Sequence, residues 1–201
     1  MIVGRSAEQS RINRLVASWS QPRPIDPESS GCATGRPEEW NGDEMRTNQA
    51  SKDFMQAIYS DIGAMVVGRF VFDQADGWQG QPVAGDHVFV VTHEAPKDWE
   101  FADTAPFTFV TDGVESAITQ AREVAGDRIV DVAAGNVGGQ ALRLGLIDQV
   151  VMNVVPVVFG EGRPFFGSAA GEVTLANPSL VAQGDRVTHL LYDVPRSGGQ
   201  T

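Results

Sequence analysis

The sequence predicts an α/β domain with a mostly parallel central sheet, helices on both faces and an antiparallel edge. Short apolar runs alternate with segments of helical periodicity, which is typical of parallel strands that are buried on both sides. The last strand-like runs follow one another without an intervening helix, as antiparallel neighbours do. Hydrophobic residues make up 42% of the 201 residues and charged residues 20%, which is the composition of a globular protein.

The first elements follow from hydrophobic spacing. We expect a helix over residues 47–62, because Phe54, Ile58 and Ile62 recur every four residues. A glycine then breaks the pattern, and residues 64–68 are continuously apolar, as a buried strand would be. The same reasoning predicts further strands at residues 87–92, 107–110 and 128–134.

A second amphipathic helix is expected over residues 114–125, where small and branched apolar residues share one face. Thr111 or Asp112 could cap its start with a side-chain oxygen, and Gly126 suits its end. The remaining expected elements are a short helix at 139–144 and strands at 148–159, 172–176 and 187–194.

The first 39 residues differ from the rest of the chain. They hold five arginines and five acidic residues, so the whole net charge of −11 lies in residues 40–201. Prolines and small polar residues from residue 20 onward favour a loop. We therefore expect a divergent, irregular segment over residues 1–39 and one domain over 40–201. Four apolar residues of the first segment could line a short helix that Pro22 would end: Ile12, Leu15, Val16 and Trp19.

Composition also restricts the class of partner. The 26 acidic residues outnumber 15 basic ones, which argues against nucleic acid and anionic membrane surfaces as partners. One cysteine and three histidines argue against a disulfide framework and against a metal site rich in either residue. The chain shows neither a signal peptide nor an apolar run of about 20 residues, so we expect a cytoplasmic protein.

Two glycine-rich turns are the strongest candidates for a ligand site. Glycine lets a phosphate approach the backbone, N–H groups at a helix start can donate to it, and an arginine adds a fixed positive charge. Because parallel strands end at the same edge of a sheet, two such turns suit the two phosphates of a dinucleotide. Taken singly, each could be a tight turn without a ligand. The residues are Gly68, Arg69 and Phe70 in the first turn, and Gly135, Asn136, Val137 and Gly138 in the second.

Several segments, in their order and spacing, carry a family resemblance: residues 40–43, 63–69, 88–93, 107–117, 141–148, 155–160 and 187–190. Together they span about three-quarters of the chain. They resemble the dihydrofolate reductase-like family, and within it the reductase domain of the bifunctional deaminase-reductase of bacterial riboflavin biosynthesis, the RibD C-terminal domain. The resemblance implies the same α/β fold and a homodimer.

The resemblance also implies an activity, namely hydride transfer from NADPH to a pyrimidine- or pteridine-like heterocycle such as 5-amino-6-(5-phosphoribosylamino)uracil. NADH stays open as an alternative cofactor. In the family the two glycine turns hold the cofactor pyrophosphate. The end of the second strand lies near the adenosine ribose, at Thr92 and His93 here. For His93 an ordinary surface histidine is the alternative.

Two departures from the family pattern concern the start of the chain and the second turn. Family members begin with a strand and a Ser-Leu-Asp-Gly-like segment beside the substrate, which residues 1–39 lack. Ala134 stands where a further glycine is common. The catalytic acid is therefore unassigned, with Asp43 a candidate and a solvated loop acid its alternative. Three explanations stay open: a divergent functional start, a degenerate copy, and a mistaken start or shifted reading frame. The alternative function is a dinucleotide-binding module without turnover.

Overall fold

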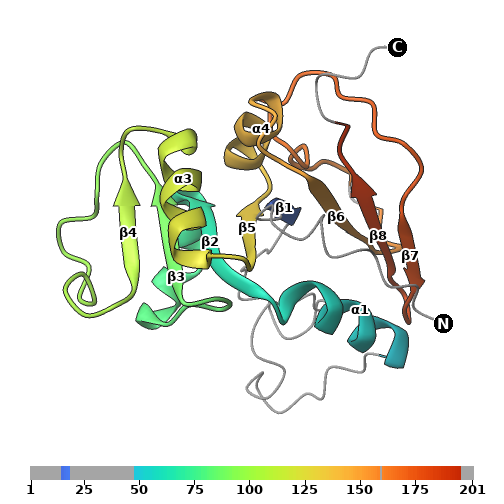
Figure 1. Cartoon of the computed structure of the whole chain (residues 1–201), viewed down its shortest axis with the longest axis horizontal. Coiled ribbons are helices and arrows are strands. Elements are labelled where there is room, and N and C mark those ends of the chain that lie inside the picture. The colour runs from blue at the N-terminus through green and yellow to red at the C-terminus, as the bar shows by residue number, and fades with distance from the viewer. Residues whose placement is uncertain (1–14, 19–47, 159, 196–201) are drawn as a thin grey trace.

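The computed structural model describes the backbone of residues 15–18, together with residues 48–158 and 160–195. Eight strands form one sheet in the order β4-β3-β2-β5-β1-β6-β8-β7 (Figure 1). All pairs from β4 to β6 are parallel, and β8 runs antiparallel to both β6 and β7. The predicted fold class, including the antiparallel edge, is confirmed. The strands are β1 (Leu15–Ser18), β2 (Ile62–Gly68), β3 (His87–Val91), β4 (Phe107–Val110), β5 (Ile129–Ala133), β6 (Gln149–Val154), β7 (Leu180–Gln183) and β8 (Thr188–Asp193).

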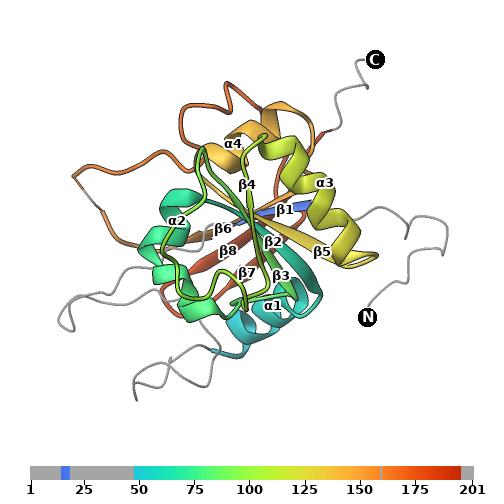
Figure 2. The same ribbon diagram turned by 90° about the vertical axis from the view of Figure 1, so that its left-hand side faces the viewer.

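Helices cover the sheet on both faces (Figure 2). Apolar side chains of α3 and α4 pack on one face of β2, β3 and β5, while those of α1 and α2 pack on the other face. The sheet therefore separates two apolar clusters, which explains why β2 and β5 are apolar at nearly every position. The helices are α1 (Gln49–Tyr59), α2 (Arg69–Gln74), α3 (Val114–Ala125) and α4 (Asn136–Arg143), and the 3₁₀ segment η1 spans Asp76–Gly80.

β1 occupies the centre of the sheet. It pairs in parallel with β5 on one side, where Leu15 lies opposite Val130, and with β6 on the other, where Val16 lies opposite Gln149. The expected short helix through Leu15 and Val16 is therefore wrong, and so is the expectation that the first strand is missing. Two neighbouring strands offer hydrogen-bond partners on both sides, and this tertiary pairing overrides a helical spacing of four apolar residues.

The division of the chain at residues 39 and 40 stays a prediction, because residues 19–47 lie outside the described part. Asp43 lies there as well. Leu15–Ser18 nevertheless belongs to the same sheet as the rest of the domain. The two segments are thus joined through the sheet centre, whatever their difference in composition.

Several element boundaries also differ from expectation. α1 ends at Tyr59, and Ile62 is the first residue of β2, because its side chain completes the apolar cluster under α1. β6 ends at Val154, two residues before Pro156, which lacks the N–H that a central ladder needs. The last hairpin uses β7 at Leu180–Gln183 rather than the expected strand at 172–176.

α4 begins earlier than expected, whereas α3 begins where expected but without the expected cap. α4 begins at Asn136 rather than at residue 139. α3 begins after Gly113, whose φ is 109°, and no side chain caps it, so the expected cap by Thr111 or Asp112 is wrong. Among the described residues, no helix combines the length and the apolar character needed to cross a membrane.

Candidate functional site

The two predicted glycine turns lie side by side at the carboxyl edge of the sheet. Gly68 ends β2 and precedes α2, and Val137 lies in the first turn of α4 after β5. A Cβ atom on Gly68 would lie 3.1 Å from Val137 Cγ2, which is tighter than most real contacts. Because β2 and β5 are neighbours in the sheet, the glycine lets the two turns approach each other. The sequence-based expectation that they meet is confirmed.

The start of α4 is closely packed as well. Gly135 has φ 83° and ψ −150°, a conformation open to glycine, and its carbonyl accepts the Gly139 N–H at 2.8 Å. A Cβ atom on Gly138 would lie 2.9 Å from the Ala133 carbonyl oxygen. The Gly135 N–H donates to the carbonyl of Phe165 at 2.6 Å. One amide of the predicted phosphate cradle therefore already has a protein partner, whereas the first amides of α4 have no acceptor within the helix.

The loop after β6 folds back onto this turn. Phe165, Phe166 and the residues around them pack on the apolar cluster beneath α4. Asn136 lies directly against Gly167, whose φ of 60° and lack of a side chain make room for it. The loop also reaches α2, because the Arg163 guanidinium lies 4.1 Å from the centre of the Phe70 ring. Phe70 is 50% exposed, so this cation–π contact leaves much of the ring open to solvent.

Arg69 and the end of β3 converge on one carbonyl. Arg69 Nη1 donates to the Glu94 carbonyl at 3.0 Å, and Thr92 Oγ1 donates to the same oxygen at 2.9 Å. Arg69 Nε also pairs with Asp73 Oδ1 at 2.7 Å, and the arginine side chain is 38% exposed. The structure thus brings Arg69 and Thr92 together, and the exposed His93 follows in the same loop. Part of the arginine's charge is offset by Asp73.

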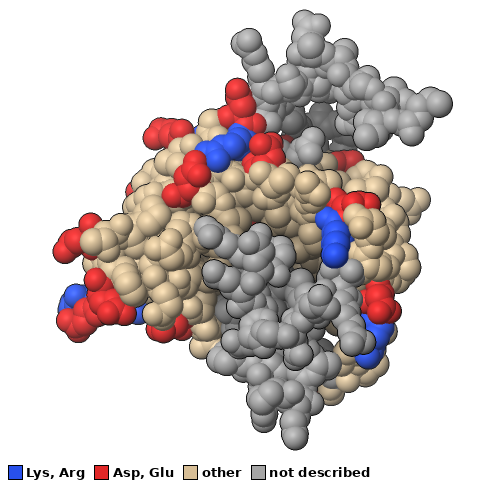
Figure 3. All heavy atoms as spheres, turned by 90° about the horizontal axis from the view of Figure 1, so that it is seen from below, with Lys and Arg blue, Asp and Glu red and all other residues tan. Residues whose placement is uncertain are grey.

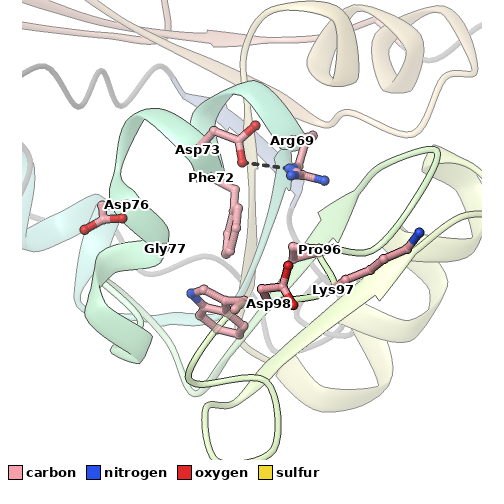
Figure 4. Close-up of a pocket in the computed structure, with 9 residues that line it drawn as sticks. Arg69, Phe72, Asp73, Asp76, Gly77, Pro96, Lys97 and Asp98 are labelled. Carbon is pink, nitrogen blue, oxygen red and sulfur yellow. Dashed lines mark hydrogen bonds and ion pairs between the residues drawn. The ribbon is translucent and has the colours of Figure 1, made fainter.

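A cleft opens beside Arg69 (Figure 4). Its volume is about 420 Å³, and one wall comes from α2 and η1 while the other comes from the loop after β3. Phe72 and Trp99 give it an aromatic wall, with ring centroids 5.2 Å apart at 74°. A smaller depression of about 260 Å³ lies between Arg69 and Lys97. The larger cleft is lined by Arg69, Phe72, Asp73, Asp76, Gly77, Pro96, Lys97, Asp98 and Trp99.

Lys97, Trp99 and Asp73 were not predicted as site residues, and Asp73 lies in α2. Lys97 and Trp99 lie in the loop after β3, as does His93, and this position in the sequence could have identified them. Acidic and basic side chains elsewhere are interspersed: on the face drawn in Figure 3, basic side chains lie beside acidic ones rather than in a patch of their own.

A second polar cluster lies at the antiparallel end of the sheet, and we name it the buried clip: the buried Ser51 and His189 with the exposed Asn153. Ser51 Oγ lies 2.8 Å from His189 Nε2, and His189 Nδ1 lies 2.7 Å from Asn153 Oδ1. The His189 ring also stacks on Phe54, with centroids 4.7 Å apart. Burial lowers the pKa of His189 below its usual value, so the neutral ring is favoured.

The clip joins a serine, a histidine and a third polar side chain in the order found in serine hydrolases, but its serine and histidine are closed to solvent. Ser51 is 2% exposed and His189 4%. Gly184 lies so close to Ser51 Oγ that even a Cβ atom would overlap it. A substrate carbonyl could not reach the serine, so the clip joins α1 to β6 and β8 and serves the fold. The sequence separates Ser51 and His189 by 138 residues and gave no sign of this contact.

Among the described residues, no group of three or more histidine, cysteine or acidic side chains is arranged to hold a metal ion. No protein-family model matches the sequence, and no curated protein matches it. Solved structures do match it over almost its whole length.

A protein of Shewanella sp. PV-4 ascribed to riboflavin biosynthesis is 16% identical, with a TM-score of 0.56, over 92% of this chain and 99% of its own. A pyrimidine reductase-like protein of Corynebacterium diphtheriae is 13% identical, with a TM-score of 0.54, over 92% of each chain. RibD of Acinetobacter baumannii is 12% identical, with a TM-score of 0.53; the match covers 93% of this chain and 59% of RibD. The chain therefore has the fold of RibD and of the pyrimidine reductase-like protein, and the resemblance seen in the sequence is confirmed at the level of the fold.

Proposed function

We propose that the protein is an NADPH-dependent reductase of the RibD type, acting on a pyrimidine- or pteridine-like heterocycle. The observation that carries the proposal is the close contact of the two glycine turns, Gly68 against Val137, with Arg69 half-exposed beside them. The fold shared with a pyrimidine reductase-like protein supports the same class of activity. A cytoplasmic location accords with such a substrate.

The residues at this edge fit an anionic dinucleotide. We expect Arg69 to bind the pyrophosphate, together with backbone amides of Asn136, Val137 and Gly138 at the start of α4. Gly135 would shape the turn, since its own N–H donates to Phe165. Because the chain has a net charge of −11, these local donors would be needed to offset its repulsion of an anionic cofactor.

A preference for NADPH over NADH requires donors for a 2′-phosphate. Arg69 and Lys97 both line the depression of about 260 Å³, and Thr92 and His93 lie in the same loop as Lys97. Lys97 now pairs with Glu94 at 3.0 Å, and both side chains are more than two-thirds exposed, so the lysine can turn to a phosphate at little cost. We therefore infer that NADPH binds more tightly than NADH.

When bound, the nicotinamide would supply the hydride. The role of the chain is to hold that ring and the acceptor in register, which can account for a large part of a rate enhancement. The group that protonates the substrate is unassigned, and Asp43 stays a candidate outside the described residues.

The alternative is a module that binds a dinucleotide without turnover. One observation favours it: the loop around Phe165 to Gly167 lies directly on the second turn and occupies one amide of the cradle. The argument from a missing first strand no longer supports it, since β1 is in place. The two functions share the cofactor site and differ in chemistry alone.

Titration of the purified chain with NADPH and NADH, followed by nicotinamide fluorescence, tests the cofactor site. Arg69→Ala should weaken NADPH binding by about 1–3 kcal/mol, because it removes a charged donor to phosphate. Arg143→Ala is a matched control, since Arg143 is an exposed arginine at the far end of α4. Lys97→Ala should weaken NADPH binding more than NADH binding.

The possible results separate the hypotheses. No binding at millimolar NADPH would exclude both the reductase and the module. Binding without oxidation by any aminopyrimidine or pteridine tested would favour the module. Equal losses for Arg69→Ala and Arg143→Ala would remove Arg69 from the site.

A further inference from the structure

One loop contacts both glycine turns of the proposed cofactor site. It spans residues 160–167, after β6, and we name it the strap. At the second turn the Gly135 N–H donates to the Phe165 carbonyl at 2.6 Å. A Cβ atom on Gly139 would overlap the Phe166 carbonyl oxygen, so the strap and α4 are in direct backbone contact. This end of the strap is therefore held closely against the second turn.

The strap meets the first turn through the side chain of Arg163. The guanidinium lies 4.1 Å from the centre of the Phe70 ring. Phe70 is the second residue of α2, directly after Arg69, and is 50% exposed. Since a cation–π contact at an exposed site is weak, the arginine can leave the ring at little cost. The contact therefore positions a cation at the first turn without fixing it there.

The charge of Arg163 is not offset by a bound carboxylate. Its guanidinium forms neither an ion pair nor a hydrogen bond within the described part of the chain, whereas Arg69 pairs with Asp73 at 2.7 Å. A cation over an aromatic ring interacts through its charge, so the guanidinium N–H groups stay available for an acceptor. In a chain of net charge −11, this exposed side chain brings a positive charge and donors to the turn where an anion is expected.

We propose that Arg163 is a second phosphate-binding arginine of the cofactor site, which the strap places on the pyrophosphate of a bound dinucleotide. The inference rests on the proposed function for the identity of the ligand. Phe70 follows Arg69 directly, so a guanidinium over its ring lies beside the turn at which we expect the pyrophosphate. Arginine suits this role because its planar fork can donate two hydrogen bonds to one phosphate. The Phe70 ring would hold the arginine near its bound position before the ligand arrives, which lowers the entropy lost on binding.

Titration of the full chain with NADPH and with NADH, followed by nicotinamide fluorescence, tests this role. Arg163→Ala should raise both dissociation constants by the same factor, about tenfold or more, because the two nucleotides share the pyrophosphate. Lys97→Ala should act mainly on NADPH, so the pair of variants separates the pyrophosphate from the 2′-phosphate. Arg163→Lys keeps the charge but loses the paired donors, and should recover part of the affinity. Arg143→Ala is the matched control, because it removes an exposed arginine from the far end of α4.

The Phe70 ring gives a second measurement. Phe70→Leu removes the aromatic face but keeps an apolar side chain, and should raise the dissociation constant of NADPH about threefold. In the Arg163→Ala background the same substitution should have no further effect, because the ring acts through the arginine. Losses from the two substitutions that simply add would overturn the proposed arrangement.

The midpoint of thermal unfolding shows whether Arg163 only fastens the strap to α2. Arg163→Ala should leave the midpoint unchanged, because the side chain is exposed. A lower midpoint with unchanged affinity would overturn the inference, and so would an affinity loss confined to NADPH. If Arg69→Ala weakens binding but Arg163→Ala binds like the wild type, the proposed function stands and this inference alone fails. A wild type that binds neither nucleotide at millimolar concentration would overturn both.

Discussion

The edge around the two glycine turns and the buried clip both join segments that are far apart in the sequence, yet they have different roles. In the clip, Ser51 and His189 are almost fully buried and bind each other within the protein. At the edge, Arg69 is 38% exposed, and the first amides of α4 have no acceptor within the helix. Convergent polar groups therefore do not by themselves identify a site. What distinguishes the edge is that its donors remain accessible to a ligand.

The largest expected effect concerns Gly139, where the edge depends on close packing. A Cβ atom there would overlap the Phe166 carbonyl oxygen and lie 3.0 Å from the Ala170 nitrogen. Both are backbone atoms that cannot rotate away. Gly139→Ala should lower the free energy of unfolding by about 3 kcal/mol and weaken nucleotide binding, since α4 or the loop must move. Chemical denaturation measures the first effect and cofactor titration the second.

Gly162→Ala is the control for that change. Nothing lies within 4 Å of the Cβ position on Gly162, and its φ is outside the left-handed region. Its stability should match that of the wild type. If Gly139→Ala were equally harmless, the loop would not be held against α4, and the edge would be more open than its contacts indicate.

A smaller effect is expected in the clip from Ser51→Ala. The substitution leaves His189 Nε2 without its partner at 2.8 Å in a place that water does not reach. An unsatisfied buried nitrogen should cost about 2 kcal/mol of stability, and cofactor binding should be unchanged. Ser116→Ala is matched to it, because Ser116 lies on α3 and its hydroxyl accepts from the nearby Gln120, at 3.1 Å. A loss of cofactor affinity in Ser51→Ala would contradict the separation of the two regions.

The two regions also differ in how far the sequence predicts them. Gly68, Arg69 and Gly135 were predicted together because each lies where a strand ends, and parallel strands end at one edge, whereas Thr92 came from the family resemblance. The clip depends on the register of β6 against β8, in which Asn153 lies opposite His189. Nothing in the local pattern fixes that register, so the contact could not be predicted.

The strands also differ in how well the sequence predicts them. β2, β3, β4 and β5 are apolar at most positions and bounded by polar or glycine residues, so they were predicted within two residues. β1 and β7 are four residues long and become strands through their neighbours. β1 fills the gap between β5 and β6, and β7 pairs with β8 alone. Short segments of this kind carry too little periodicity to outweigh an alternative, and tertiary pairing decides them.

The smallest effect is the pH dependence of stability that the clip should impose. Asn153 Oδ1 can only accept, so Nδ1 of His189 carries the hydrogen and Nε2 accepts from the Ser51 hydroxyl. Burial lowers the pKa of His189 in the folded protein below 6.5. The unfolded chain therefore binds a proton at a higher pH than the folded one. Stability should be level above pH 6.5 and fall as the pH drops below it, because unfolding then takes up a proton.

Chemical denaturation at a series of pH values from 8 to about 5 measures this slope. His189→Gln should reduce it, although the substitution also lowers stability at every pH. Some slope should remain, because burial lowers the pKa of His87 in the same direction. An unchanged slope in His189→Gln would mean that the clip tolerates the charged ring. Burial of His189 would then not disfavour its protonated form, which the contrast between the two regions requires.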